Sequence, residues 1–252
     1  MTKNTTLVAG LAVLEYLIDK GRPISLSQIA QDLGISKSTT HRILQTLVDL
    51  GYIAQRSTRQ YAMTLKTWEL GARTVNRLDF RTRASSVMRD LQRRTNATIH
   101  LSVLSGEDVI YIDKLDGATP VGGYSVIGGR APAYCVATGK ALLAWHERTL
   151  TDLLNVRPLH RFTKTTISDT AQLAMELHKI KKQGYALNKG EWREAIWGVA
   201  APIFGGIDGR AVAAIGISGP ARQIKQTAPK ELGLVLRDAA LTISGPGAPS
   251  PF

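Results

Sequence analysis

The residues best suited to chemistry lie at the start of one short predicted helix, where hydroxyl groups and cations follow one another closely. Such side chains can contact DNA, because a helix fits the major groove and its first polar residues reach the base edges. Arginine, lysine and hydroxyl groups also bind phosphates. We therefore predict DNA contacts from Ser36, Lys37, Ser38, Thr39, His41 and Arg42, and from Arg56 and Arg59 on the hairpin that follows.

The elements that position these residues have the order of a winged helix-turn-helix. Ser25 and Gln28 have the spacing of a capping box, and Gly34 can end the short helix that they begin. Ser36 can cap a second helix, and two alternating runs around residues 57–58 predict a basic hairpin. The buried face of the second helix is predicted to contain Thr40, Ile43, Leu44, Leu47 and Leu50. We assign residues 1–65 to this domain.

The composition agrees with a nucleic-acid partner without locating the site. The net charge of +12 also fits a membrane surface or acidic substrates, and a small helical domain with a solvated charged face is the plainer alternative. The first 21 residues predict an amphipathic helix without the basic start of a signal peptide, and no apolar run is long enough to span a bilayer. We therefore expect a cytoplasmic protein with no membrane partner.

After residue 65 the sequence pattern changes from a helical domain to mixed helices and strands. A linker helix is predicted over residues 66–78, an α+β domain with helices packed on one face of its sheet over 79–245, and a loose tail over 246–252. The expected strands are 99–103, 109–115, 122–127, 186–188, 199–204 and 211–218. The expected helices are 80–94, 137–145, 150–155, 170–183 and 230–243.

Several residues of the second domain resemble parts of catalytic or metal sites. The segment ATGK at 137–140 is similar to a phosphate loop, but Tyr134 stands where such a loop needs glycine. Cys135, the single cysteine, has no histidine at a recognisable triad spacing, and His100 has no second metal ligand at a partner spacing. Structural roles are favoured for both. Trp192 and Trp197 could line a pocket or fill the core. We predict no metal, no cofactor and no catalytic residue.

From Leu7 to Gly245 the chain resembles the IclR family of bacterial transcriptional regulators. Three motifs carry the resemblance in order: SLSQIAQDLGISKSTTHRILQTLVDLGY with its wing, GGRAPAYCVATGKALLAW, and GYALNKGEW with VAAPIF and GRAVAAIGISGP. The resemblance implies a DNA-binding domain joined by a helix to a GAF-like mixed α/β effector-binding domain. It also implies a homodimer through the N-terminal domains, a homotetramer through the effector domains, and a palindromic double-stranded operator.

The resemblance further implies a small-molecule effector. Family members repress or activate genes for small-molecule catabolism, commonly of aromatic acids or other carboxylates, and the bound metabolite changes operator binding. The backbone N–H groups that begin the 137–145 helix would suit a carboxylate, and Arg193 could add a cation. The implied effector-binding residues are Ala137, Thr138, Gly139, Asn188, Ile196, Gly198, Gly216 and Ser218.

The chain departs from the family pattern beside the implied pocket. Where many members carry Asp-x-Glu-Glu, residues 188–191 read NKGE, and the usual Leu-His is replaced by AY at 133–134. An amide in place of an acid removes repulsion toward a carboxylate, which favours a neutral or anionic ligand, with aromatic ones among the candidates. Two alternatives are an enzyme acting on a small carboxylate and an architectural DNA-binding protein without a ligand. The implied pocket offers no general base for the first.

Overall fold

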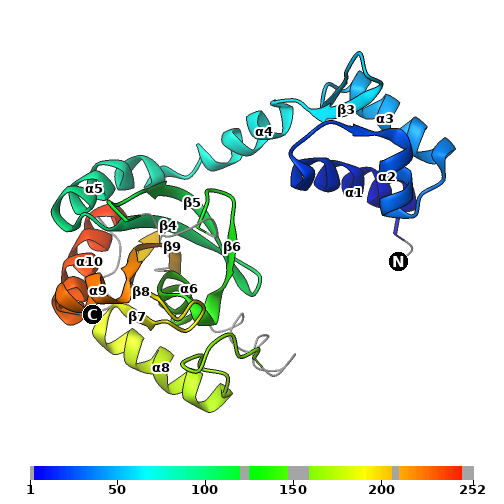
Figure 1. Cartoon of the computed structure of the whole chain (residues 1–252). Helices are drawn as coiled ribbons and strands as arrows, with labels where there is room; N and C mark the ends of the chain where they lie inside the picture. The colour runs from blue at the N-terminus through cyan, green and yellow to red at the C-terminus, as the bar shows by residue number, and fades with distance from the viewer. Residues whose placement is uncertain (1–2, 120–124, 147–158, 206–209, 246–252) are drawn as a thin grey trace. The chain divides into compact units, whose positions relative to one another are not determined.

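The chain folds into two compact units, Met1–Arg77 and Leu78–Phe252 (Figure 1). In the computed structural model the described residues are 3–119, 125–146, 159–205 and 210–245. Among them, no helix combines the length and the apolar character needed to cross a membrane.

The N-terminal unit is a winged helix-turn-helix, as predicted. Its three strands form an antiparallel sheet in the order β1-β3-β2. The sequence did not predict β1, which contributes only two residues to this sheet. The elements are α1 (Thr5–Lys20), β1 (Ile24–Ser25), α2 (Leu26–Leu33), α3 (Lys37–Asp49), β2 (Ile53–Gln55), β3 (Gln60–Met63) and α4 (Lys66–Val75).

The ends of α2 and α3 follow from local hydrogen bonds that the sequence predicted. The backbone N–H of Gln28 donates to Ser25 Oγ at 3.3 Å, so Ser25 begins α2. Gly34 ends α2 in the left-handed conformation, with φ +64°. Ser36 Oγ then accepts from the backbone N–H of Thr39 at 3.2 Å and begins α3. These caps fix where the polar face of α3 starts.

The buried face of α3 is confirmed at four of the five predicted positions. Thr40, Ile43, Leu44 and Leu47 are buried, and the three apolar ones pack in a core that α1, α2 and the small sheet complete. Leu50 is different, because it is 59% exposed. Leu50 follows the last residue of the helix, Asp49, and lines an open groove beside α1 instead of the core.

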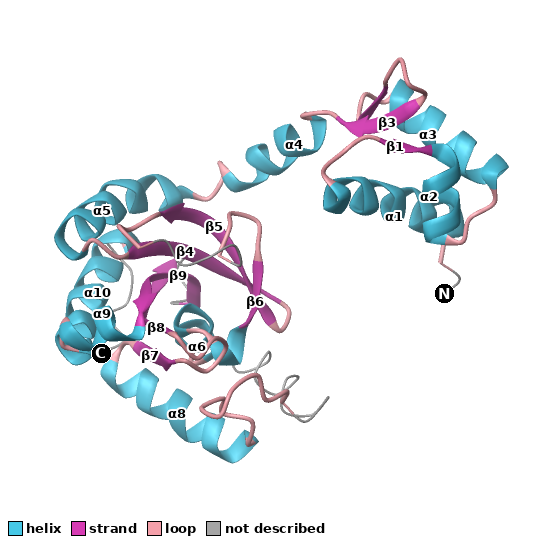
Figure 2. Ribbon diagram, in the orientation of Figure 1, coloured by secondary structure: helices cyan, strands magenta, loops and turns pink. Residues whose placement is uncertain are grey.

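The second unit is built around a six-stranded antiparallel sheet in the order β6-β5-β4-β9-β8-β7 (Figure 2). Its first part comprises α5 (Asp79–Thr95), β4 (Thr98–Ser105), β5 (Asp108–Leu115), β6 (Arg130–Pro132), the 3-10 turn η1 (Ala133–Cys135) and α6 (Ala137–Leu143). The remainder comprises α8 (Thr170–Gln183), β7 (Ala186–Lys189), β8 (Ile196–Gly205), β9 (Arg210–Pro220), α9 (Ala221–Gln226) and α10 (Pro229–Ser244).

Helices cover both faces of this sheet, so the prediction of helices on one face was wrong. The α6 face contains Gly198 and Gly216, where an added Cβ would meet Ala137 and Thr138 of α6 respectively. The opposite face contains residues such as Ile215, and α5 and α10 contact the sheet through β4 and β8. Most residues in the middle of β8 and β9 are buried, so these strands lack the alternation of buried and exposed residues that marks a sheet covered on one face.

Three further differences concern element boundaries. No strand forms over residues 125–127, and the edge strand is instead β6, which pairs with β5. The rest of the predicted 122–127 strand, the predicted 150–155 helix and the 246–252 tail lie outside the described residues. The linker helix α4 ends at Val75, three residues before its predicted end, and the short helix α9 was not predicted.

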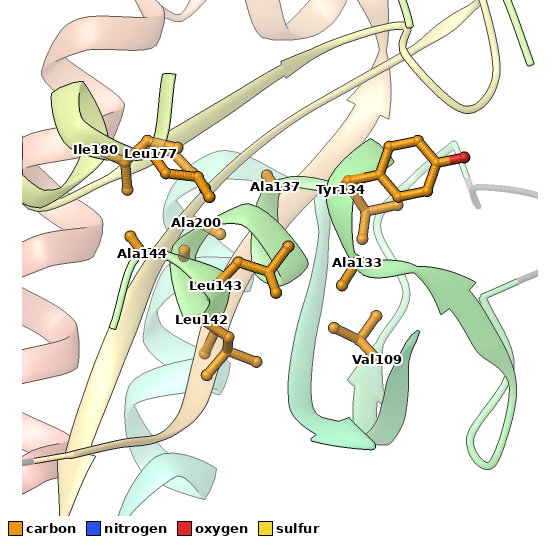
Figure 3. Packing of buried hydrophobic residues seen from close by; sticks show 14 of the residues in the cluster. Val109, Ala133, Tyr134, Ala137, Leu142, Leu143, Ala144, Leu177, Ile180 and Ala200 are labelled. Atoms are coloured by element: carbon orange, nitrogen blue, oxygen red, sulfur yellow. The ribbon is translucent and has the colours of Figure 1, made fainter. Parts of the chain in front are cut away.

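The core of the second unit surrounds α6. All seven residues of this helix are buried. Figure 3 shows Leu142 and Leu143 of α6 within a cluster that includes Val109 of β5 and Leu177 of α8. A helix buried on every side fixes its neighbours closely, because each small change in its position is felt by the sheet, η1 and α8 together.

Candidate functional site

The polar face of α3 begins with a network of hydroxyl groups. Ser36 Oγ contacts Thr39 Oγ1 at 2.9 Å and lies 3.1 Å from Ser38 Oγ. All three side chains are exposed. Ser36 also caps the helix, so its first role is structural, while Ser38 and Thr39 present their hydroxyl groups to solvent at the first turn.

The predicted cations are exposed on the same unit. Lys37, His41 and Arg42 lie on α3 away from its buried face. Arg56 and Arg59 flank the exposed tip of the β2–β3 hairpin, where the Arg59 N–H donates to the Arg56 carbonyl at 2.9 Å. The turn places Arg59 in the left-handed region, with φ +58°. This arrangement gives a helix and a wing that can both reach a phosphate backbone.

A cavity of about 40 Å³ lies in the second unit, between α6 and the strands β4, β8 and β9. Seven of the eight residues implied for the effector line it; the exception is Gly139. The lining is His100, Tyr111, Ser125, Val136, Ala137, Thr138, Asn188, Trp192, Arg193, Ile196, Gly198, Val199, Gly216, Ile217 and Ser218. No carboxylate belongs to this set, so the described lining does not repel an anion.

Gly139 was predicted to bind the effector, but it lies outside the cavity lining and its small size is needed for packing. A Cβ on Gly139 would lie 2.2 Å from the carbonyl oxygen of Ala133. This glycine therefore lets α6 cross the backbone of η1 at very short range, and it lies away from the cavity lining. Gly216 has a similar function, since a Cβ there would lie 2.7 Å from Thr138 Cγ2.

The start of α6 has one property that favours an anion and one that does not. Val136 precedes the helix and makes no side-chain capping bond, so no side chain of the N-cap residue occupies the first N–H groups. The helix has only seven residues, and a helix dipole is the sum of its aligned peptide units. The N–H groups at Ala137 and Thr138 are therefore at most a supporting element of a ligand site.

His100 lines the cavity, whereas the sequence favoured a purely structural role for this histidine. Its ring is buried, with Nε2 2.7 Å from Ser218 Oγ and the ring centre 5.0 Å from that of Tyr111. Burial, with a smaller effect of Lys114, lowers the pKa of His100 to about 3, so the ring is neutral near pH 7. The strand pairing of His100 with Gly216 would have revealed its place, but that register is not visible in one sequence.

Lys140, the last residue of the ATGK segment, forms a buried ion pair. Its Nζ lies 2.7 Å from Glu191 Oε1 and 3.3 Å from Glu176 Oε1, and its side chain is fully buried. Burial raises the pKa of Glu191, and the Lys140 ammonium opposes this effect. The Glu191 N–H in turn donates to Asn188 Oδ1 at 2.8 Å. Lys140 therefore positions the turn that carries Asn188 and is not available for a phosphate.

The structure also places the single cysteine and the two tryptophans that the sequence suggested as functional residues. Cys135 is buried, and burial raises the pKa of its thiol to about 12, so it is no nucleophile. Trp192 lines the cavity, with the Arg193 guanidinium 5.0 Å from its ring centre. Trp197 instead contacts Lys225, whose Nζ lies 4.6 Å from the centre of the Trp197 ring. Within the described ranges, no three side chains of His, Cys, Asp or Glu gather where they could hold a metal ion.

Comparison with known families decides the relationship. Residues 72–245 match the family described as bacterial transcriptional regulator IclR C-terminal, and residues 6–57 match the IclR helix-turn-helix domain. The chain belongs to the IclR family. IclR-family proteins are transcriptional regulators and not enzymes, so the enzyme alternative is excluded and the predicted fold class is confirmed.

Individual IclR-family relatives cover nearly the whole chain. KdgR of Escherichia coli (strain K12) is 37% identical over 225 residues, which are 88% of this chain and 85% of KdgR. The structure of Thermotoga maritima IclR matches with a TM-score of 0.80 and 30% identity, covering 96% of this chain and 98% of that one. An IclR homolog from Microbacterium hydrocarbonoxydans, complexed with 4-hydroxybenzoate, matches with a TM-score of 0.83 and 25% identity, covering 95% and 97%.

The Gly139→Ala substitution tests the close packing of α6 in this IclR-family domain. The new Cβ would meet backbone atoms of Ala133, which cannot rotate away, so the free energy of unfolding should fall by about 3 kcal/mol or more. Urea denaturation measures the change. Gly71→Ala is the control, because no atom lies within 4 Å of the new Cβ there. An unchanged unfolding midpoint for Gly139→Ala would contradict the packing role.

The His100→Gln substitution tests the neutral buried ring. Below about pH 6.5 the unfolded chain protonates this histidine while the folded chain does not, so the unfolded state binds more protons. As the pH is lowered below about 6.5, this group should therefore reduce the free energy of unfolding by about 1.4 kcal/mol per pH unit, down to the folded-state pKa of about 3. Urea unfolding at several pH values should show a weaker acid dependence for His100→Gln. The exposed His178→Gln is the control, and parallel curves for wild type and His100→Gln would contradict the assignment.

Proposed function

We propose that this IclR-type regulator controls genes of small-molecule catabolism through a carboxylate effector, aromatic or aliphatic, bound in the cavity beside α6. The observation that carries the proposal is the chemistry of the cavity lining. It combines the side-chain amide of Asn188 with one guanidinium, that of Arg193, and contains no acid. A carboxylate in this place would find donors and meet no repelling charge.

A relative supports the same ligand class. The Microbacterium hydrocarbonoxydans homolog was crystallised with 4-hydroxybenzoate, which is an aromatic carboxylate. For this chain the proposed effector residues are Ala137, Thr138, Asn188, Ile196, Gly198, Gly216 and Ser218, and Gly139 is no longer among them.

The size of the cavity connects ligand binding to regulation. About 40 Å³ is room for a few water molecules and not for an aromatic ring. An effector must therefore displace part of the lining, and the segment around Trp192 and Arg193, which is only partly buried, is the part that can move most easily. A ligand that binds the expanded form better than the closed form shifts the equilibrium between them, which is the physical basis of a switch.

The proposed partner of the N-terminal unit is a palindromic double-stranded operator. Two copies of α3 would read half-sites about 34–36 Å apart, with Lys37, Ser38, Thr39, His41 and Arg42 nearest the groove. Arg56 and Arg59 of the hairpin would bind phosphates. Because bacterial operators lie in the cytoplasm, the proposal places the protein there.

The second copy has a natural docking face on α1. Leu7, Val8 and Leu11 are between 51% and 61% exposed, although their apolar side chains would favour burial. Leu7 and Leu11 belong to a groove that Leu50 of the α3 end also lines, which accounts for the exposure of that leucine. We infer a homodimer through this face, and a homotetramer that forms through the effector units.

The Arg42→Ala substitution tests operator binding. Removing a cation that binds a phosphate should weaken binding about tenfold to all DNA sequences, and it should reduce the slope of log affinity against log salt by about 1 for each phosphate that is no longer neutralised. Fluorescence anisotropy with DNA from upstream of its own gene measures both quantities. Arg222→Ala, the same charge change on exposed α9, should leave them unchanged. If wild type shows no salt-dependent binding to this DNA, the operator proposal fails.

The Leu11→Glu substitution tests the dimer. A carboxylate buried against a second α1 would be unpaired, so the variant should be monomeric at concentrations where the wild type is dimeric or larger. Sedimentation velocity gives the mass of each. Met175→Glu replaces another exposed apolar residue, 66% exposed on α8, and should not separate the N-terminal units. A dimeric Leu11→Glu protein would show that another face joins the two copies.

A further inference from the structure

We propose that His100 and Ser218 determine which effector is accepted: together they bind an uncharged oxygen of the ligand, a hydroxyl or a ketone, while its carboxylate binds cations at the cavity rim. The inference rests on the proposed function, because it assumes a carboxylate effector. It assigns the two ends of the ligand to two chemically different ends of the site.

The inner end has an unused hydrogen-bonding atom. His100 is only 4% exposed, and its Nε2 is engaged by Ser218 Oγ at 2.7 Å. Its Nδ1 is buried and has no hydrogen-bond partner among the described residues. A buried polar atom without a partner costs about 1–3 kcal/mol. For a lining residue, that cost is removed when a ligand atom completes the hydrogen bond.

The neutral ring selects an uncharged ligand group. When the Ser218 hydroxyl donates to Nε2, the proton of the ring is on Nδ1, which can donate to a hydroxyl or ketone oxygen. In the other tautomer Nδ1 accepts from a ligand hydroxyl. A carboxylate here would be desolvated without a cation of its own, since Lys114, the register partner of His100, is ion-paired with Asp116 at 2.7 Å.

The outer end has the opposite character. Trp192 and Arg193 belong both to the cavity lining and to an open surface hollow that Arg161 and Lys164 also line. The three exposed cations, Arg161, Lys164 and Arg193, face one acid of the same hollow, Glu194. A carboxylate at this rim keeps part of its hydration and meets a net positive charge. The ligand class that fits both ends is a narrow hydroxy- or keto-carboxylate whose two polar groups are far apart.

Two matched pairs of probes test the inference on the full-length protein. Isothermal titration with 4-hydroxybenzoate and benzoate, and with 4-oxopentanoate and pentanoate, compares ligands that differ only at the uncharged end. In at least one pair the oxygenated member should bind about tenfold or more tightly than its partner. His100→Leu should bring the ratio of the two affinities in that pair close to one, and Arg193→Ala should weaken both members alike.

Controls separate this inference from the proposed function. His178→Leu, an exposed histidine on α8, should keep the preference. If His100→Leu does not fold, Ser218→Ala should reduce the preference in its place. Equal affinity within both pairs would overturn the inference and leave a carboxylate effector intact. Binding of none of the four probes would overturn this ligand class, while the salt-dependent operator assay judges the regulator function independently.

Discussion

The ion pair between Lys140 and Glu191 is the constraint on which the effector unit depends. A helix buried on every side, as α6 is, can carry a lysine only if its charge is matched within the core. Removing one partner of such a pair costs about 3–5 kcal/mol, because the other charge stays buried and alone. The pair joins α6 to the turn that ends in Trp192, so the same interaction that stabilises the core also shapes the cavity wall.

Close packing and ligand chemistry meet in the same few residues. Gly139 and Gly216 bring α6 against η1 and the sheet, and the space left beside the helix is small. The polar atoms around that space are not equivalent, because His100 is neutral and Arg193 is charged. The cavity therefore has a buried, neutral residue at one place in its lining and an exposed, charged one at another, and the proposed effector would be oriented by this difference as well as by shape.

The sequence predicted the features that local chemistry determines. Ser25, Gly34 and Ser36 mark helix ends through bonds to residues at most five positions away, and alternation marked the β4–β5 hairpin. Features that depend on distant pairing were missed. The place of His100 in the cavity requires the β4–β9 register, and the packing role of Gly139 requires knowledge of how α6 crosses η1. The seven implied effector residues that line the cavity were identified by family resemblance. The spacing of residues in one sequence would not have shown that they lie together.

The helix α4 has a consequence for how a signal could be carried. None of its ten residues is buried, and Trp68 is 71% exposed. An isolated helix of this length is marginally stable in water, and the exposed Glu69–Arg73 pair adds only a few tenths of a kcal/mol. Burial of Trp68 against another surface would therefore stabilise this helix more than its own side-chain pair does. Because the helical and unfolded states of such a segment differ little in free energy, a small change in its surroundings is enough to order the helix or to unfold it.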